Sequence, residues 1–188
     1  MKSPSPIALP EGVFLAHFSK RGLARLDWPE EKERKAESRK QKSALAPTAV
    51  VPAELPRWLQ QTRAALEMVM AGKSPRELPP LDLSAGTSFQ QQVWHCLRKI
   101  RPGQTRTYAE LAAAIGRPRA ARAVGNACGA NPIPLLIPCH RVLPSSGGLG
   151  GFSGPVQWKR SLLEREGRQD RRVAGPTSAS PFRRTARP

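Results

Sequence analysis

Residues 131–142 read Asn-Pro-Ile-Pro-Leu-Leu-Ile-Pro-Cys-His-Arg-Val, so a cysteine with a histidine beside it follows an apolar run. Proline fixes φ and disfavours helix in the residue before it, which predicts an extended, stiff segment. The thiolate is the nucleophilic form of cysteine, and a neighbouring imidazole makes it available at neutral pH. Cys139 and His140 are therefore candidates for a nucleophile and its base, although a buried cysteine beside a surface histidine is the commoner meaning of such a pair.

The charge of the chain points to a polyanionic partner. Its 188 residues carry a formal net charge of +17, with a pI near 11.3. Nucleic acid is the first candidate for such a field. A membrane surface fits poorly, because no segment has the pattern of a basic amphipathic helix. High pI alone does not exclude a structural RNA-binding protein, but that class needs aromatic platforms, which one Tyr and scattered Phe do not supply.

The number and spacing of the cysteines and histidines indicate the redox compartment of the protein and whether it could bind a metal ion. Three cysteines in no CxxC spacing argue against a disulfide framework, and three histidines far apart in sequence predict no zinc site. The chain shows no signal peptide and no apolar run long enough to span a bilayer. We therefore expect a cytoplasmic protein in a reducing compartment.

The first half of the chain predicts a small sheet and a helix. Alternating apolar and charged residues predict two short strands around a turn, and an apolar face predicts a later helix. Prolines, serines and glycines then mark a domain boundary. The expected elements are a loose segment at 1–10, strands at 13–18 and 23–28, a charged flexible loop at 30–42, a helix at 56–70 and the boundary at 75–86.

The second half predicts several short helices. Ser88 with Gln91 forms a possible capping box for a helix that ends near residue 100. Thr107 with Glu110 forms a second capping box, and Gly116 suits the end of that helix.

A third helix, expected at residues 120–128, consists mostly of small residues. By spacing, these last two helices fit a helix-turn-helix and a plain αα-hairpin about equally. Small residues with Arg122 as the one long side chain favour close contact with a nucleic-acid backbone.

The final part of the chain predicts a loop, a helix and a tail. Residues 145–154 are rich in Gly and Ser, but Leu149 and Phe152 indicate an ordered loop whose backbone N–H groups could bind a planar polar ligand. In the helix expected at 156–166, Glu166 shares a face with Trp158 and Leu162. An acid at this end of a helix opposes the macrodipole, which solvent exposure would explain, but the shared face suggests that Glu166 points inward to a partner. Residues 168–188 have the composition of a disordered basic tail.

Cys139, His140 and Glu166 could supply a nucleophile, a base and a group that orients the base. Adjacent side chains on extended backbone point to opposite faces, so a bridging water is the natural link between the thiol and the imidazole. A cysteine protease is a poor alternative, since its Cys and His lie far apart in sequence.

At this point the motifs resemble a known family. Ile137-Pro138-Cys139-His140-Arg141-Val142, preceded by Ala121-Arg122-Ala123-Val124-Gly125 and Asn131-Pro132, resembles the methylated-DNA–protein-cysteine methyltransferases, the O6-alkylguanine-DNA alkyltransferases. Other matches follow in order: Phe89-Gln90-Gln91-Gln92-Val93-Trp94, Pro102-Gly103, Thr107-Tyr108, Ser153-Gly154 and Arg165-Glu166-Gly167. The match is continuous over residues 87–167, whereas before residue 87 only the hairpin and the following helix are similar.

The resemblance implies an α+β fold in two domains. Residues 1–84 would form a small N-terminal domain with an antiparallel sheet and a helix, and a charged flexible stretch near 30–50. Residues 85–167 would form a mainly helical DNA-binding alkyltransferase domain with a helix-turn-helix, and residues 168–188 a disordered basic tail.

The implied function is DNA repair by direct reversal of damage. A monomer without cofactor or metal would bind duplex DNA, flip an O6-alkylguanine and transfer the alkyl group irreversibly to Cys139. O4-alkylthymine is a further candidate substrate.

The resemblance also implies a role for each site residue. Cys139 accepts the alkyl group, His140 takes the thiol proton through a water and is oriented by Glu166, Tyr108 donates a proton to the departing guanine, and Asn131 holds the turn. Arg122 would fill the space left by the flipped base. DNA contacts are further expected from Thr107, Ala121, Ala123 and Gly125, and the base pocket from Leu149, Gly150, Phe152 and Ser153. Family members often have Tyr where this chain has Phe152.

Two other functions stay open at this level. Alkyltransferase-like proteins bind the lesion without reacting, but they have Trp at the position of Cys139. An alkylation-sensing DNA-binding regulator would keep the helix-turn-helix without requiring Tyr108, Ser153 and Glu166 together.

Overall fold

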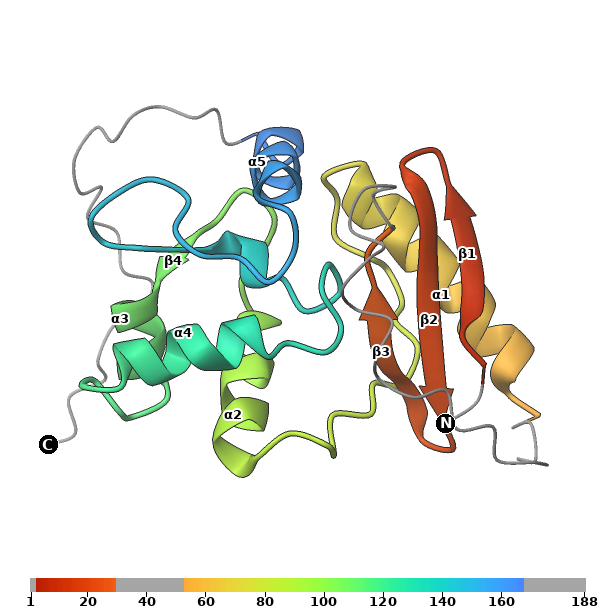
Figure 1. Ribbon diagram of the computed structural model, residues 1–188, viewed down its shortest axis with the longest axis horizontal. Coiled ribbons are helices and arrows are strands. Elements are labelled where there is room, and N and C mark those ends of the chain that lie inside the picture. Colours follow the sequence, from red (N-terminus) through yellow and green to blue (C-terminus); the bar gives the residue numbers. More distant parts are fainter. Residues whose placement is uncertain (1–2, 30–52, 168–188) are drawn as a thin grey trace, which may run out of the picture.

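The structure, a computed structural model, describes residues 3–29 and 53–167, so the predictions for 30–42 and for the tail lie outside the described residues. The first half is a three-stranded antiparallel sheet in the order β1-β2-β3, with α1 packed against it (Figure 1). The second half is mainly helical, and α5 lies beside the sheet half (Figure 1). This arrangement confirms the predicted α+β class. The elements are β1 (Ser5–Leu9), β2 (Gly12–Ser19), β3 (Gly22–Asp27), α1 (Leu55–Met70), α2 (Ser88–Leu97), β4 (Arg106–Thr107), α3 (Tyr108–Ala114), α4 (Ala121–Gly129), the 3-10 helix η2 (Cys139–Arg141), β5 (Val142–Leu143) and α5 (Val156–Arg165).

The first strand corrects the prediction of a loose N-terminal segment. Residues 5–9 pair with β2 from Ser5 opposite Ala16 to Leu9 opposite Gly12. Pro6 has no N–H to donate, but β1 is an edge strand, where a proline is tolerated. Ile7 is 3% exposed, so its burial in the core outweighs the proline-rich composition.

The other elements of the first half agree with the sequence. β2 covers the strand predicted at 13–18, β3 covers the strand predicted at 23–28 except its last residue, and α1 covers the predicted helix to within a residue. The buried face of α1 follows helical spacing, which explains why the pattern was readable: Trp58, Thr62, Ala65, Leu66, Val69 and Met70.

Residues 71–87 connect the halves and run along the sheet. The N–H of Leu23 donates to Pro80 O at 2.8 Å, and the N–H of Asp82 donates to Leu23 O at 2.8 Å. The N–H of Leu26 also donates to Pro132 O at 2.9 Å, so β3 holds the start of the Cys-His segment. Both halves contribute to one hydrophobic cluster, and the domain division at residue 84 stays a prediction.

Capping boxes set the starts of α2 and α3. At α3 the predicted box is confirmed, because Thr107 accepts from the N–H of Glu110 and the Glu110 side chain accepts in return. At α2 the cap is Thr87 with Gln90, one residue before the predicted pair. Thr87 has the extended backbone that a cap needs, with φ −62° and ψ 160°.

The helices α3 and α4 pack against each other as a helix-turn-helix. Gly116 after α3 has φ 74°, the left-handed conformation that ends a helix at little cost for glycine. The indole N–H of Trp94 in α2 donates to Ala127 O in α4 at 2.8 Å, which fixes α4 on the helical half.

Candidate active site

Residues 131–141 form a series of turns that ends in the 3-10 helix η2, so the prediction of extended backbone is wrong for this part of the segment. The Asn131 side chain accepts from the N–H of Ile133 at 3.1 Å and donates to Ile137 O at 2.8 Å. The N–H of Ile137 also donates to Ile133 O at 3.0 Å, and the buried Leu135 has φ 73°. Prolines are compatible with tight turns as well as with extended backbone. Here the hydrogen bonds of the buried Asn131 amide stabilise the turns.

Cys139 is presented by a tight turn at Pro138. Pro138 has φ −79° and ψ 67°, the values of an inverse γ-turn, and the N–H of Cys139 donates to Ile137 O at 2.8 Å. Cys139 is 4% exposed and lines a pocket of about 410 Å³. The pocket is lined by Tyr108, Gly125, Asn126, Cys128, Gly129, Cys139, Gly151, Phe152 and Ser153.

His140 and Glu166 form a buried pair next to this pocket. His140 Nε2 lies 3.0 Å from Glu166 Oε1, and the two side chains are 0% and 1% exposed. Burial alone would raise the pKa of Glu166, but hydrogen bonds from His140 and Arg141 outweigh it and bring this pKa to about 2. An ionised carboxylate can only accept, so Nε2 of His140 carries the hydrogen in this pair.

The other ring nitrogen of His140 is left as an acceptor. Nδ1 is buried and has no hydrogen-bond partner among the described residues. Burial lowers the pKa of His140, although Glu166 opposes this, and the ring is neutral at neutral pH. A neutral imidazole with a free lone pair is a base, and its tautomer is set by Glu166.

The thiol of Cys139 needs such a base. Burial raises the pKa of Cys139, while the side chains of Asn131 and Ser153 and the charge of Lys159 lower it in part. The thiol therefore keeps its proton at neutral pH. Cys128 shares the pocket, but burial raises its pKa to about 12.

Two buried cations hold this arrangement and were missed in the sequence. Arg141 donates from Nε and Nη2 to Glu166 at 2.8–3.1 Å and from Nη1 to Ile100 O at 2.6 Å. A two-pronged guanidinium–carboxylate contact fixes the orientation of Glu166. The Glu166 carboxylate also accepts from the N–H of Gly103 at 3.2 Å.

The second missed cation is Lys159, which is 0% exposed. Its Nζ donates to Val142 O at 2.8 Å and to Gly151 O at 3.3 Å, so it ties the Cys-His segment to the loop over the pocket. Burial lowers the pKa of Lys159, while Cys139 and Cys128 raise it.

The spacing of α5 could have revealed Lys159. Positions 159, 162, 163 and 166 follow the i, i+3, i+4, i+7 pattern, and the buried face starts with Lys159 and ends with Glu166. The predicted face had Trp158 in place of Lys159, because a pattern of apolar residues leaves out a charged one.

Tyr108 also lines the pocket. Its O–H donates to Gly151 O at 3.5 Å, and burial raises its pKa, so the phenol keeps its proton at neutral pH. The N-cap Thr107 precedes it. Gly125 faces the Tyr108 ring, where an added Cβ would lie 3.8 Å from two ring carbons.

The remaining predicted residues divide into two groups. Arg122 and Ala123 are exposed on α4, Ala121 is half-buried, and Asn126 of the same helix lines the pocket without having been predicted. In the loop, Phe152 and Ser153 line the pocket, whereas Leu149 and Gly150 do not; Gly150 packs against Pro144.

The described residues contain no cluster of three His, Cys, Asp or Glu side chains able to hold a metal ion. No helix in residues 3–29 and 53–167 is long and apolar enough to cross a membrane. All three cysteines are free.

The depressed pKa of Glu166 predicts a pH dependence of stability. The carboxylate contributes its full stabilisation above the unfolded value near 4.5, and loses it as the pH falls toward about 2. The shift corresponds to about 3 kcal/mol. Urea unfolding between these pH values should therefore show a larger fall in the free energy of unfolding in the wild-type protein than in Glu166→Gln, where Asp82, another carboxylate with a lowered pKa, still contributes. Equal falls in both proteins would contradict the prediction.

The fold and the site define a class: proteins in which a helix-turn-helix is followed by a tight turn that presents a buried cysteine, with a buried His-Glu pair beside it. The sequence model of the family described as 6-O-methylguanine DNA methyltransferase, DNA binding domain, matches residues 88–168. The methylated-DNA–protein-cysteine methyltransferase of Mycobacterium leprae is 45% identical over 118 residues, which cover 60% of this chain and 71% of the relative. The protein of the same name from Mycobacterium tuberculosis is 56% identical over 86 residues, 46% of this chain, and this chain spans about half of that relative (52%).

A crystal structure of Mycobacterium tuberculosis OGT in complex with DNA is similar over 86% of this chain and 90% of that chain, with a TM-score of 0.66 and 37% identity. The chain belongs to the methylated-DNA–protein-cysteine methyltransferase family.

Proposed function

We propose that the protein repairs DNA by moving the O6-alkyl group of a flipped guanine in duplex DNA onto Cys139. The observation that carries this is the buried thiol of Cys139 in the lining of a pocket beside α4, with the neutral imidazole of His140, oriented by Glu166, next to it in the chain. The M. tuberculosis relative has been crystallised with DNA, which supports the same partner here. The expected compartment is the bacterial cytoplasm.

The reaction starts with removal of the Cys139 proton. His140 Nδ1 takes it through a water, because Nδ1 has no direct partner among the described residues and Nε2 is occupied by Glu166. The thiolate then attacks the alkyl carbon, a C–S bond forms and the C–O6 bond breaks, its electron pair leaving with the guanine. Tyr108 donates its phenolic proton to the departing guanine and recovers one from His140.

The products are guanine in DNA and an S-alkyl thioether on Cys139. A thioether is stable, so each molecule reacts once. Asn131 acts as a positioning residue because its amide closes the turn that carries Cys139. Lys159 stabilises the thiolate through its positive charge and holds Gly151 at the pocket.

The damaged guanine must be flipped out of the duplex to reach this pocket, because its O6 atom is otherwise buried in the base stack. The exposed side of α4 has small residues that allow close approach of the minor groove, and Arg122 projects from its first turn to fill the space left by the base. Thr107, Ala121, Ala123 and Gly125 complete this contact surface. Phe152 and Ser153 line the pocket and would contact the flipped base. Leu149 and Gly150 belong to the same loop but do not line the pocket.

The proposal is tested by mixing the protein with duplex DNA that carries O6-methylguanine labelled on the methyl group. Label should move to protein in a one-to-one ratio, and no second round should follow. An alkyltransferase-like protein would retain the lesion DNA without taking the label, and a regulator without repair activity would bind DNA with or without the lesion and take no label. Either result would overturn the proposal.

The basic tail provides a separate prediction about affinity. Deleting residues 168–188 removes six arginines, which would otherwise neutralise phosphates. The plot of log binding constant against log salt should become flatter by about 0.9 for each phosphate that the tail neutralises in the full chain. Fluorescence anisotropy over a salt series measures this slope, and an unchanged slope would show that the tail does not touch the DNA.

A further inference from the structure

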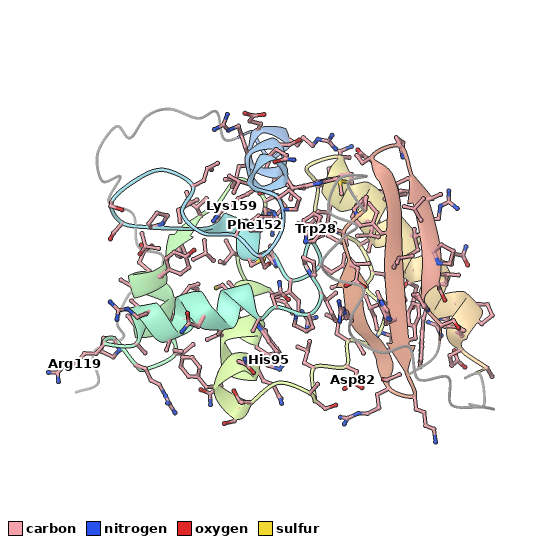
Figure 2. All side chains as sticks on the ribbon, viewed as in Figure 1. Trp28, Asp82, His95, Arg119, Phe152 and Lys159 are labelled. Atoms are coloured by element: carbon pink, nitrogen blue, oxygen red, sulfur yellow. The ribbon has the colours of Figure 1, made fainter. Side chains whose placement is uncertain are left out.

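The wall of the pocket is supported from the sheet half by Trp28. The Trp28 and Phe152 rings pack edge to face, with centroids 5.6 Å apart and an interplanar angle of 64°. Trp28 also packs against Trp158 at 5.2 Å and Phe14 at 6.4 Å. Figure 2 shows Trp28 between the sheet half and Phe152, with Lys159 on the other side. A residue remote in sequence thus lies directly behind a pocket residue.

The backbone of the loop rests on the same indole. A Cβ added at Gly154 would lie 2.7 Å from Trp28 Nε1 and 2.8 Å from Cε2, too close for any real side chain. It would also lie 3.1 Å from Phe152 Cε1. Gly154 is therefore in van der Waals contact with Trp28, and residues 152–154 cannot move toward the sheet while the indole is present.

The opposite side of Phe152 is also bounded. Lys159 Nζ lies 5.7 Å from the centre of the Phe152 ring and holds Gly151 O at 3.3 Å. Phe152 has no hydroxyl that could fix it by a hydrogen bond, so its position depends on packing against Trp28 and Lys159. Because Lys159 is itself anchored to Val142 O, Trp28 is the partner whose size sets how far the loop can retreat.

We propose that Trp28 is a specificity-determining residue, which limits the width of the alkyl group that the pocket accepts by blocking retreat of residues 152–154. This inference rests on the proposed alkyl transfer to Cys139. It assigns a part in substrate selection to the residue that directly follows β3. Trp28 acts through its contacts with Phe152 and Gly154 and does not touch the transferred group.

The test compares the transfer rates from duplexes with O6-methylguanine and with O6-benzylguanine. In Trp28→Ala the ratio of the benzyl rate to the methyl rate should rise by about fivefold or more, since a hydrophobic pocket discriminates groups by the room it leaves. Trp58→Ala is the matched control, because Trp58 stacks on Phe18 at 6.3 Å in the same half and lines a different cavity. That control should keep the wild-type ratio.

Gly154→Ala provides a second, independent arm. Its Cβ should push the loop away from the indole into the pocket and lower the benzyl rate by about fivefold or more. The double variant Trp28→Ala/Gly154→Ala should recover much of this loss, because the main clash is with the Trp28 side chain. A purely stabilising role of Trp28 predicts the opposite, with the two losses adding.

The outcomes separate the two proposals. If wild-type protein transfers neither group, the proposed function fails. If it transfers methyl but the ratio in Trp28→Ala stays at the wild-type value, or Gly154→Ala is not rescued, the role of Trp28 is refuted. Should circular dichroism find Trp28→Ala unfolded, Trp28→Leu replaces it under the same criteria.

Discussion

Cys139→Ala is expected to lose alkyl transfer completely while it still binds lesion DNA. An alanine methyl group has no lone pair to attack the alkyl carbon, and the other pocket thiol cannot replace it. Burial raises the pKa of Cys128 to about 12, so it keeps its proton at neutral pH, and unlike Cys139 it has no neighbouring histidine in the chain to remove that proton. The measurement is label transfer from O6-methylguanine duplex, with DNA binding followed in parallel by anisotropy.

Cys96→Ala is the control for this substitution. Cys96 is half-buried in α2 and does not line the pocket, so transfer should continue at the wild-type rate. If Cys139→Ala still takes the label, the nucleophile is another residue and the assignment of the site is wrong.

Glu166→Ala is expected to cost about 3–5 kcal/mol in the free energy of unfolding, because it leaves a buried charge without its partner. The charge is the guanidinium of Arg141, which is 6% exposed and has Glu166 as its ion-pair partner. Transfer should slow as well, since the Nε2 hydrogen of His140 loses its acceptor and the base tautomer is no longer enforced. Urea denaturation measures the first effect and single-turnover transfer the second.

Glu164→Ala is the matched control, from the same end of α5 but with an exposed side chain. It should change the free energy of unfolding by less than about 0.5 kcal/mol. Glu166→Gln keeps the shape of the carboxylate without its charge and should fall between the two. Equal stability of Glu166→Ala and Glu164→Ala would show that the buried network contributes nothing.

Most of the predictions that rested on local sequence patterns agree with the structure. The strands at β2 and β3, the apolar face of α1 and the capping box at Thr107 depend on residues a few positions apart, and all are present. The displaced cap at α2 has a simple cause: Thr87 with Gln90 and Ser88 with Gln91 have the same spacing. Only the backbone of Thr87 decides between them.

Long-range contacts were the part that the sequence did not predict. The turn that carries Cys139 depends on the hydrogen bonds of the Asn131 amide, which join residues distant along the segment. The Asn131-Pro132 pair is a turn signal, but the prediction of extended backbone followed the restricted φ of the prolines instead. Arg141 and Lys159 are buried only because Glu166 and the carbonyls of Ile100, Val142 and Gly151 meet them in space. The Trp28–Phe152 contact joins the two halves and has no signature in either one.

The most direct measurement is a mass spectrum of the digested protein before and after contact with duplex DNA containing O6-methylguanine. The proposed reaction predicts that the peptide with Cys139 gains one methyl group in place of one hydrogen, in proportion to the lesion supplied, and that the peptides with Cys96 and Cys128 stay unchanged. An unmodified Cys139 peptide after loss of the lesion, or a methyl group on any other residue, would contradict it.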